Sequence, residues 1–169
     1  MIRALAIAVV VCTATPAFAQ DSTRVGAISL AYVARSSKAG KAGLAEIEKF
    51  VKQKESEAAV KATELQKQQL ELQKTSVGLS PRALGDLQKT FDKSRLEFER
   101  FQQDARAEIE RMQTTFDAEF RVKLAPIIDV VSKEKGLQFV FGLEQAAIVW
   151  WNPAVDISED VVKRLDAGK

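Results

Sequence analysis

Apolar and polar residues alternate between positions 44 and 124 with the three- and four-residue spacing of an α-helix. Within this stretch, apart from Gly85, glycine and proline occur only in segment 77–81. Ser80 is a favourable N-cap, and Pro81 suits the first helical position, because an N–H group there would have no intrahelical partner. The pattern therefore predicts a helical hairpin, two long helices that fold back on each other at 77–81.

The two predicted helices differ in length and in their apolar faces. The first, over residues 41–76, has a thin apolar stripe that Lys54 and Gln69 interrupt, which suits a single partner helix. In the second, apolar residues repeat every eleven positions from Phe98 onwards, which favours a straight or right-handed pairing of the two helices. The second helix also extends beyond its partner, and Pro126 there predicts a kink or an end where the arm meets the rest of the protein.

Short apolar segments on either side of the hairpin predict β-strands. They span residues 25–30 before it and residues 137–141 and 147–151 after it, and a last short helix is expected at 159–165. These elements form a core too thin to be stable alone, and unpaired strand edges invite pairing with another chain. The pattern thus indicates a small β body that becomes stable by association.

The segment 37–43 contains the pair Gly40-Lys41, which invites comparison with a phosphate-binding loop. Such a loop requires a glycine five residues before the Gly-Lys pair and a hydroxyl residue directly after it. Arg35 and Ala42 occupy those two positions. The segment is therefore interpreted as a connector between a strand and the first long helix.

The N-terminus has the parts of a secretory signal peptide. Arg3 gives a positive start, residues 4–14 are apolar, and an Ala-x-Ala cleavage motif ends at Ala19, ahead of Gln20. An uncleaved membrane anchor is the alternative, which the short apolar run disfavours. Residues 1–19 are therefore predicted to be removed on export. The mature chain then has neither histidine nor cysteine, because the single cysteine lies in the leader.

Charge and residue types argue against several classes of function. Without Arg3 the 25 basic residues become 24, against 23 acidic ones, a net charge of +1, whereas a nucleic-acid binder is expected to carry a concentrated basic face. Without cysteine and histidine the mature chain has no thiolate or imidazole base and no ordinary zinc site. Acidic pairs such as Glu97 and Glu99 point apart on a helix. We therefore expect no nucleic-acid partner, no metal, no cofactor and no catalysis.

The feature that remains is apolar surface on a long arm with one thin partner helix. Either the phenylalanines of the second helix all pack against the first helix, or some stay uncovered and bind other molecules. Under the second interpretation the arm holds its partners by apolar contact. The residues predicted to bind are Val51, Leu65, Leu72, Phe91, Phe98, Phe101, Met112, Phe116 and Phe120.

Several segments, in their order and spacing, resemble the Skp/OmpH family of periplasmic chaperones. They are residues 25–42, 79–80, 98–105, 133–136, 152–153 and 156–161. The resemblance implies a homotrimer in which strands from three subunits form a β body, with three hairpins projecting as tentacles around a cavity. It also implies ATP-independent holding of unfolded outer-membrane β-barrel proteins, the clients, in the periplasm.

The resemblance also suggests which residues form the trimer body and which partners to expect. The basic lipopolysaccharide site proposed for the family has no matching cluster in this nearly neutral chain. Lys74, Arg82 and Lys89 do leave the hairpin tip mildly basic, which is compatible with transient membrane contact. The residues predicted to form the trimer body are Val25, Ile28, Leu30, Leu137, Phe139, Phe141, Ile148 and Trp150.

The predicted fold is therefore α+β, mostly α: a long antiparallel helical hairpin projects from a small β body that forms by trimerisation. The predicted function is that of a holdase chaperone, and the alternative is a structural coiled-coil adaptor that tethers cell-envelope components. The predicted parts are a leader at 1–19, a strand and connector at 20–43, the hairpin at 44–124, and the remaining strands and short helix of the body at 125–169.

Overall fold

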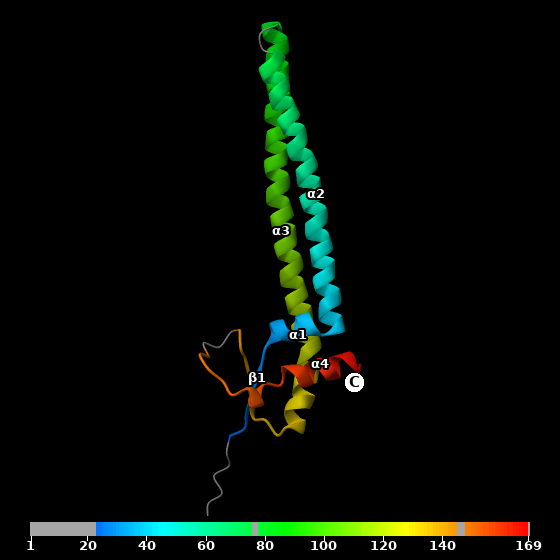
Figure 1. Ribbon diagram of the computed structural model, residues 1–169, viewed down its shortest axis with the longest axis vertical. Coiled ribbons are helices and arrows are strands. Elements are labelled where there is room, and N and C mark those ends of the chain that lie inside the picture. The colour runs from blue at the N-terminus through cyan, green and yellow to red at the C-terminus, as the bar shows by residue number, and fades with distance from the viewer. Residues whose placement is uncertain (1–22, 76–77, 145–147, 169) are drawn as a thin grey trace, which may run out of the picture.

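The protein consists of a long two-helix arm with a small body at one end (Figure 1). Its computed structural model describes residues 23–75, 78–144 and 148–168. The predicted fold class is confirmed for the single chain, which is mostly helical with a long hairpin and one small pair of strands. The elements in chain order are β1 (Val25–Ile28), α1 (Leu30–Ser36), α2 (Lys38–Thr75), α3 (Pro81–Glu134), β2 (Phe139–Gly142), the 3-10 turn η1 (Pro153–Val155) and α4 (Ser158–Asp166).

The arm is the antiparallel pair α2 and α3, as the apolar periodicity predicts (Figure 1). Ser80 caps α3 as expected, because its hydroxyl accepts a hydrogen bond from the backbone N–H of Ala83 at 3.3 Å. At 1.5 Å per residue, the 38 residues of α2 give an arm about 57 Å long. The 54 residues of α3 continue beyond it into the body.

Pro126 does not end α3, which runs unbroken to Glu134. Proline removes one backbone hydrogen bond, so a helix that continues through it needs support from elsewhere. Leu124 and Val131, on either side of Pro126, are both buried in the core of the body. Tertiary packing therefore holds this part of α3 helical. Pro126 does not end the helix, and the kink predicted there stays a prediction.

The glycine-rich segment 37–43 is the start of α2 and not a connector. Ser37 caps this helix, and its hydroxyl accepts a hydrogen bond from the N–H of Gly40 at 3.1 Å. A Cβ on Gly40 would lie 2.1 Å from the carbonyl oxygen of Ala34 in α1. A Cβ on Gly43 would lie 2.3 Å from the ring of Phe116 in α3. Glycine at these positions lets α1, α2 and α3 approach one another closely at the root of the arm.

The body is built around two parallel strands whose connection is the whole arm. Val25 pairs with Phe139 and Ile28 with Gly142. Parallel strands need a long crossover connection, and here α1, α2 and α3 provide it. The chain after η1 adds one bridge on the other side of β1, between Ala27 and Asp156. The core lies beside this sheet and contains Ile28, Val33, Phe120, Leu124, Val131, Ile157, Val161 and Leu165.

The strand predicted at 147–151 is wrong for residues 148–151, which form no strand. Ala147 lies outside the described residues. Val149 is 98% exposed, and among the described residues no strand pairs with residues 148–151. An apolar, β-branched composition favours a strand only where another strand is available.

The predicted leader at 1–19, with its cleavage between Ala19 and Gln20, lies outside the described residues, and so does Val77 in the turn. These assignments stay predictions. Within the described part of the chain, no helix combines the length and the apolar character needed to span a bilayer.

Candidate functional site

The apolar stripe of α3 faces α2, and two of its rings close the root of the arm. Phe116 and Phe120 stack with their centroids 5.3 Å apart. Phe120 is only 7% exposed and belongs to the core of the body, so its assignment to the binding surface is wrong. The helical period of α3 could not distinguish Phe120 from the residues of the arm surface, because the same apolar stripe continues from the arm into the body. The other predicted binding residues are half-buried: Val51, Leu65, Leu72, Phe91, Phe98, Phe101, Met112 and Phe116.

Lys54, which interrupts the stripe of α2 in the sequence, is part of the packing in the structure. Its side chain is 20% exposed, and its ammonium lies 3.1 Å from a carboxylate oxygen of Glu108. The same ammonium lies 4.9 Å from the ring centroid of Phe50 and 5.8 Å from that of Phe101. Lys61 lies 5.4 Å from the Phe101 ring. Cation–π contacts of this kind stabilise a half-buried lysine, so the polar residue does not break the hairpin.

Shallow grooves with apolar floors run between the two helices. The groove near the middle of the arm has a volume of about 360 Å³, and small side chains in its floor, such as Ala58 and Ala105, leave this space open. A second groove of about 270 Å³ lies near the root, beside Ile47, Met112 and Phe116. The grooves can accept apolar side chains of another molecule. The middle groove is lined by Val51, Lys54, Glu55, Ala58, Phe101, Gln102, Ala105, Arg106 and Ile109.

The structure also shows apolar side chains on the arm that the sequence analysis missed. Val60 and Leu70 on α2 and Leu96 and Val122 on α3 are all exposed to solvent. They lie outside the apolar stripes through which the two helices contact each other. The helical period therefore places them on the polar faces of the helices. Their exposure in isolation is common on protein surfaces, and we assign them no role on that ground alone.

The residues predicted to form the trimer body divide into two groups. Residues paired across parallel strands project to the same face of the sheet, which places Val25, Phe139 and Phe141 on one face and Ile28 on the other. Ile28 is buried in the core of the body of its own chain, and its assignment to the trimer body stays a prediction. Leu30 and Leu137 pack against that core. Ile148 is half-buried.

The remaining members are apolar side chains exposed on the body. Phe139 is 58% exposed, Phe141 47% and Trp150 78%. Val25 is also exposed. We call Val25, Phe139 and Phe141, which share one face of the sheet, the outer face of the body. Large side chains left open in this way mark surfaces that other chains cover.

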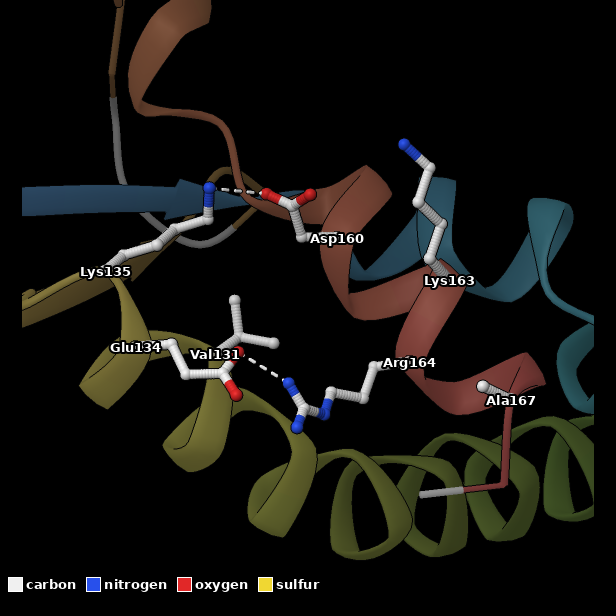
Figure 2. Close-up of a pocket in the computed structure, with 7 residues that line it drawn as sticks. All are labelled: Val131, Glu134, Lys135, Asp160, Lys163, Arg164 and Ala167. Atoms are coloured by element: carbon white, nitrogen blue, oxygen red, sulfur yellow. Dashed lines mark hydrogen bonds and ion pairs between the residues drawn. The ribbon is translucent and has the colours of Figure 1, made fainter.

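Within the body, at the C-terminal end of α3, charged side chains of α3 and α4 pair across a cavity of about 530 Å³ (Figure 2). Lys135 pairs with Asp160 at 2.7 Å, and Arg164 pairs with Glu134 at 2.5 Å. Lys163 extends away from this space (Figure 2) and pairs with Glu159 at 2.8 Å. Both signs of charge line the cavity and pair with each other, which does not favour an anion or a cation as its ligand.

Glu144, just after β2, anchors its loop to the start of α1. Its carboxylate accepts hydrogen bonds from the Ser29 hydroxyl at 2.6 Å and from the backbone N–H groups of Ala31 at 3.0 Å and Leu30 at 3.3 Å. Burial by itself raises the pKa of this carboxyl, but these hydrogen bonds outweigh burial and leave the pKa below its usual value. The ionised form of Glu144 is therefore the one that stabilises the body.

We expect the stabilisation from Glu144 to disappear in acid. Because its pKa is lowered on folding, its contribution is present above the unfolded value of about 4.3 and is lost as pH falls through the folded value. Thermal unfolding of the wild type and of Glu144→Gln between pH 7 and pH 3 should show a lower Tm for the variant at pH 7, and the difference should shrink as the pH falls. A difference that stays constant over this range would contradict the assignment.

The side chains of the arm and body offer apolar contact and ion pairing. Among the described residues, no three or more acidic, histidine or cysteine side chains gather closely enough to hold a metal ion. The contacts described above, which involve residues 23–75, 78–144 and 148–168, bring no nucleophile beside a base.

The fold combines a long helical hairpin with a small parallel strand pair. Apolar grooves lie along the arm, and the body has an apolar outer face. These features together define a class of hairpin-arm proteins. The family model of OmpH-like outer membrane proteins matches residues 24–165, and the chain belongs to this family. No protein of curated function matches the sequence significantly.

Solved structures match the chain as well. One is a protein from Caulobacter crescentus CB15, described as a candidate outer membrane chaperone (OmpH-like). It shares 24% sequence identity with this chain and superposes with a TM-score of 0.74. The match covers 86% of this chain and 85% of the other. At this identity the likeness establishes the shared fold.

Proposed function

We propose that this protein is an ATP-independent holdase chaperone that binds unfolded outer-membrane β-barrel proteins and prevents their aggregation in the periplasm. Membership of the OmpH-like family and the fold shared with the Caulobacter protein support a chaperone role. The observation that carries the proposal is the arm itself. Its stripe of apolar side chains is only half-buried by the partner helix, and grooves open beside it. The predicted leader supports the periplasmic location.

The proposed assembly is a homotrimer whose three arms surround a cavity. The outer face of the body supports association, because Phe139 and Phe141 are exposed in the single chain, and Trp150 elsewhere on the body is exposed as well. In the described residues β2 pairs with β1 along one edge only, so its other edge is free to pair with another copy. Association would bury both the rings and the strand edge, and would place the arms side by side.

The direct test is suppression of aggregation. An outer-membrane β-barrel protein unfolded in urea is diluted into buffer with the mature chain and without nucleotide, and light scattering is followed. Suppression at a small molar excess of trimer supports the proposal, and no suppression would contradict it. Recovery of many unfolded proteins from periplasmic extract separates a holdase from an adaptor, which should instead capture one folded partner in a fixed ratio.

A variant of the arm tests the surface in particular. Phe98→Ser combined with Phe101→Ser removes two half-buried rings from the stripe. We expect affinity for an unfolded client to fall about tenfold, because each ring loses part of the 1.5–3 kcal/mol that full burial of such a side chain contributes. Sedimentation should show the same oligomer as the wild type. A dissociated variant would show instead that these rings are needed for assembly, and unchanged affinity would remove them from the binding surface.

A further inference from the structure

The C-terminal helix α4 connects the body to both helices of the arm by polar contacts. A carboxylate oxygen of Asp166 accepts a hydrogen bond at 2.8 Å from the backbone N–H of Lys38, the first residue of α2. On the side of α3, the contacts are the pairs Lys135–Asp160 and Arg164–Glu134. α4 thus holds the start of one arm helix and the end of the other.

The contact between α3 and α4 differs in kind on its two sides. On one side, Val161 and Leu165 of α4 pack into the core with Val131 of α3. Beyond this apolar contact, the helices are separated by the 530 Å³ cavity, which the two ion pairs span (Figure 2). The four paired side chains are between 30% and 55% exposed. Ion pairs with this exposure hold a preferred position weakly, typically at 0–1 kcal/mol each.

A small displacement between α3 and α4 is amplified along the arm into a large displacement of its tip. Tightly packed cores resist displacement, whereas an open cavity bridged by exposed ion pairs allows the helices to shift. α2 is about 57 Å long, so a rotation of about 10° at its root moves the tip by about 10 Å. Small changes between α3 and α4 would therefore alter where the arm tip lies relative to the body.

We propose that Asp166 and the pairs Lys135–Asp160 and Arg164–Glu134 are positioning residues that set the direction of the arm on the body. We call them the root contacts. In the assembly described under the proposed function, on which this step rests, they set the width of the space between arms and hence the size of client that the arms enclose. Because the pairs are exposed, the arm direction depends on ionic strength.

The arm direction can be measured within one chain, independently of clients and of oligomeric state. The mature chain contains no cysteine, so cysteines introduced at Lys89 near the tip and at Ala154 in the body can be spin-labelled specifically. Both residues are exposed, and neither belongs to the root contacts. Labelled chains are mixed with an excess of unlabelled chains, so that the pulsed-EPR distances arise within a single chain.

Arg164→Glu places a negative side chain opposite Glu134 in place of the positive one. We expect the tip-to-body distance to shift by about 5–10 Å, or its distribution to broaden by a similar amount, from the length of the lever. The swapped pair Glu134→Arg with Arg164→Glu restores opposite charges and should restore the wild-type distances. Lys93→Glu is the matched control, because it reverses one charge in an exposed pair on the arm, Lys93–Glu97 at 3.8 Å, away from the root. This control should leave the distances unchanged.

The wild type supplies a test that needs no charge reversal. Raising salt from 0.05 M to 0.5 M shortens the Debye length from about 14 Å to about 4 Å, and the distances should shift or broaden in the direction that Arg164→Glu produces. Wild-type distances in Arg164→Glu, no rescue by the swapped pair, or no response to salt would each overturn the proposal. If the distances change as expected but the wild type holds no client, the proposed function is overturned and the role of the root contacts stands. If the wild type holds clients, Arg164→Glu should change the relative affinities for small and large clients, and Lys93→Glu should not.

Discussion

Replacing Gly40 with alanine is expected to lower the free energy of unfolding of the body by about 3 kcal/mol, the upper end of the usual cost of overpacking. The added Cβ would lie 2.1 Å from the carbonyl oxygen of Ala34 and 2.6 Å from its Cα. Both obstacles are backbone atoms, so no rotation of a side chain can relieve the contact. α1 would have to move away from α2, and Val33, which is fully buried on α1, would move with it.

Gly85 provides the matched control for this prediction. It lies within α3, and a Cβ added there would meet no atom within 4 Å. Gly85→Ala is therefore expected to stabilise the protein by about 0.5–1 kcal/mol through the better helix propensity of alanine. Urea unfolding followed by circular dichroism measures both variants. If the two alanines have similar effects, the close approach of α1 and α2 at Gly40 is not what requires glycine there.

The sequence was sufficient to predict the arm because its determinants are local. The helical period, the cap at Ser80 and the proline at the first position of α3 act within a few residues of one another. Even the unequal lengths of the two helices follow from the position of the turn. The contacts of Lys54 needed the structure, because they depend on which residues of α3 lie opposite it.

The body was predicted less well because its determinants are distant in sequence. Whether Phe120 packs inside or lies open depends on α1 and β1, which precede it by almost the whole arm. The side of the sheet that Ile28 faces follows from its register with β2, far along the chain. The glycines of 37–43 have a role that only the spacing between helices reveals. Composition alone also predicted a strand at 147–151, and residues 148–151 form none in the described part of the chain.

The second large effect is expected from charge on the outer face of the body. Phe139→Asp combined with Phe141→Asp should convert the proposed trimer into monomers and abolish client holding. Both rings are about half exposed in the single chain, on the face of the sheet opposite Ile28, so the fold of the protomer should survive. Burying unpaired carboxylates between subunits costs several kcal/mol, so the dissociation constant should rise at least about a hundredfold.

Analytical ultracentrifugation of the mature chain gives the oligomeric state, and the aggregation assay gives the holding activity. Val60→Asp is the matched control, because Val60 is 69% exposed on the arm and lies away from the body. This variant should remain a trimer. A double variant that stays trimeric with wild-type affinity would show that subunits associate through another surface. A wild type that is monomeric in solution would contradict the proposed trimer. A monomeric double variant that still holds clients would show that one arm suffices, because the arm's grooves are intact in the single chain.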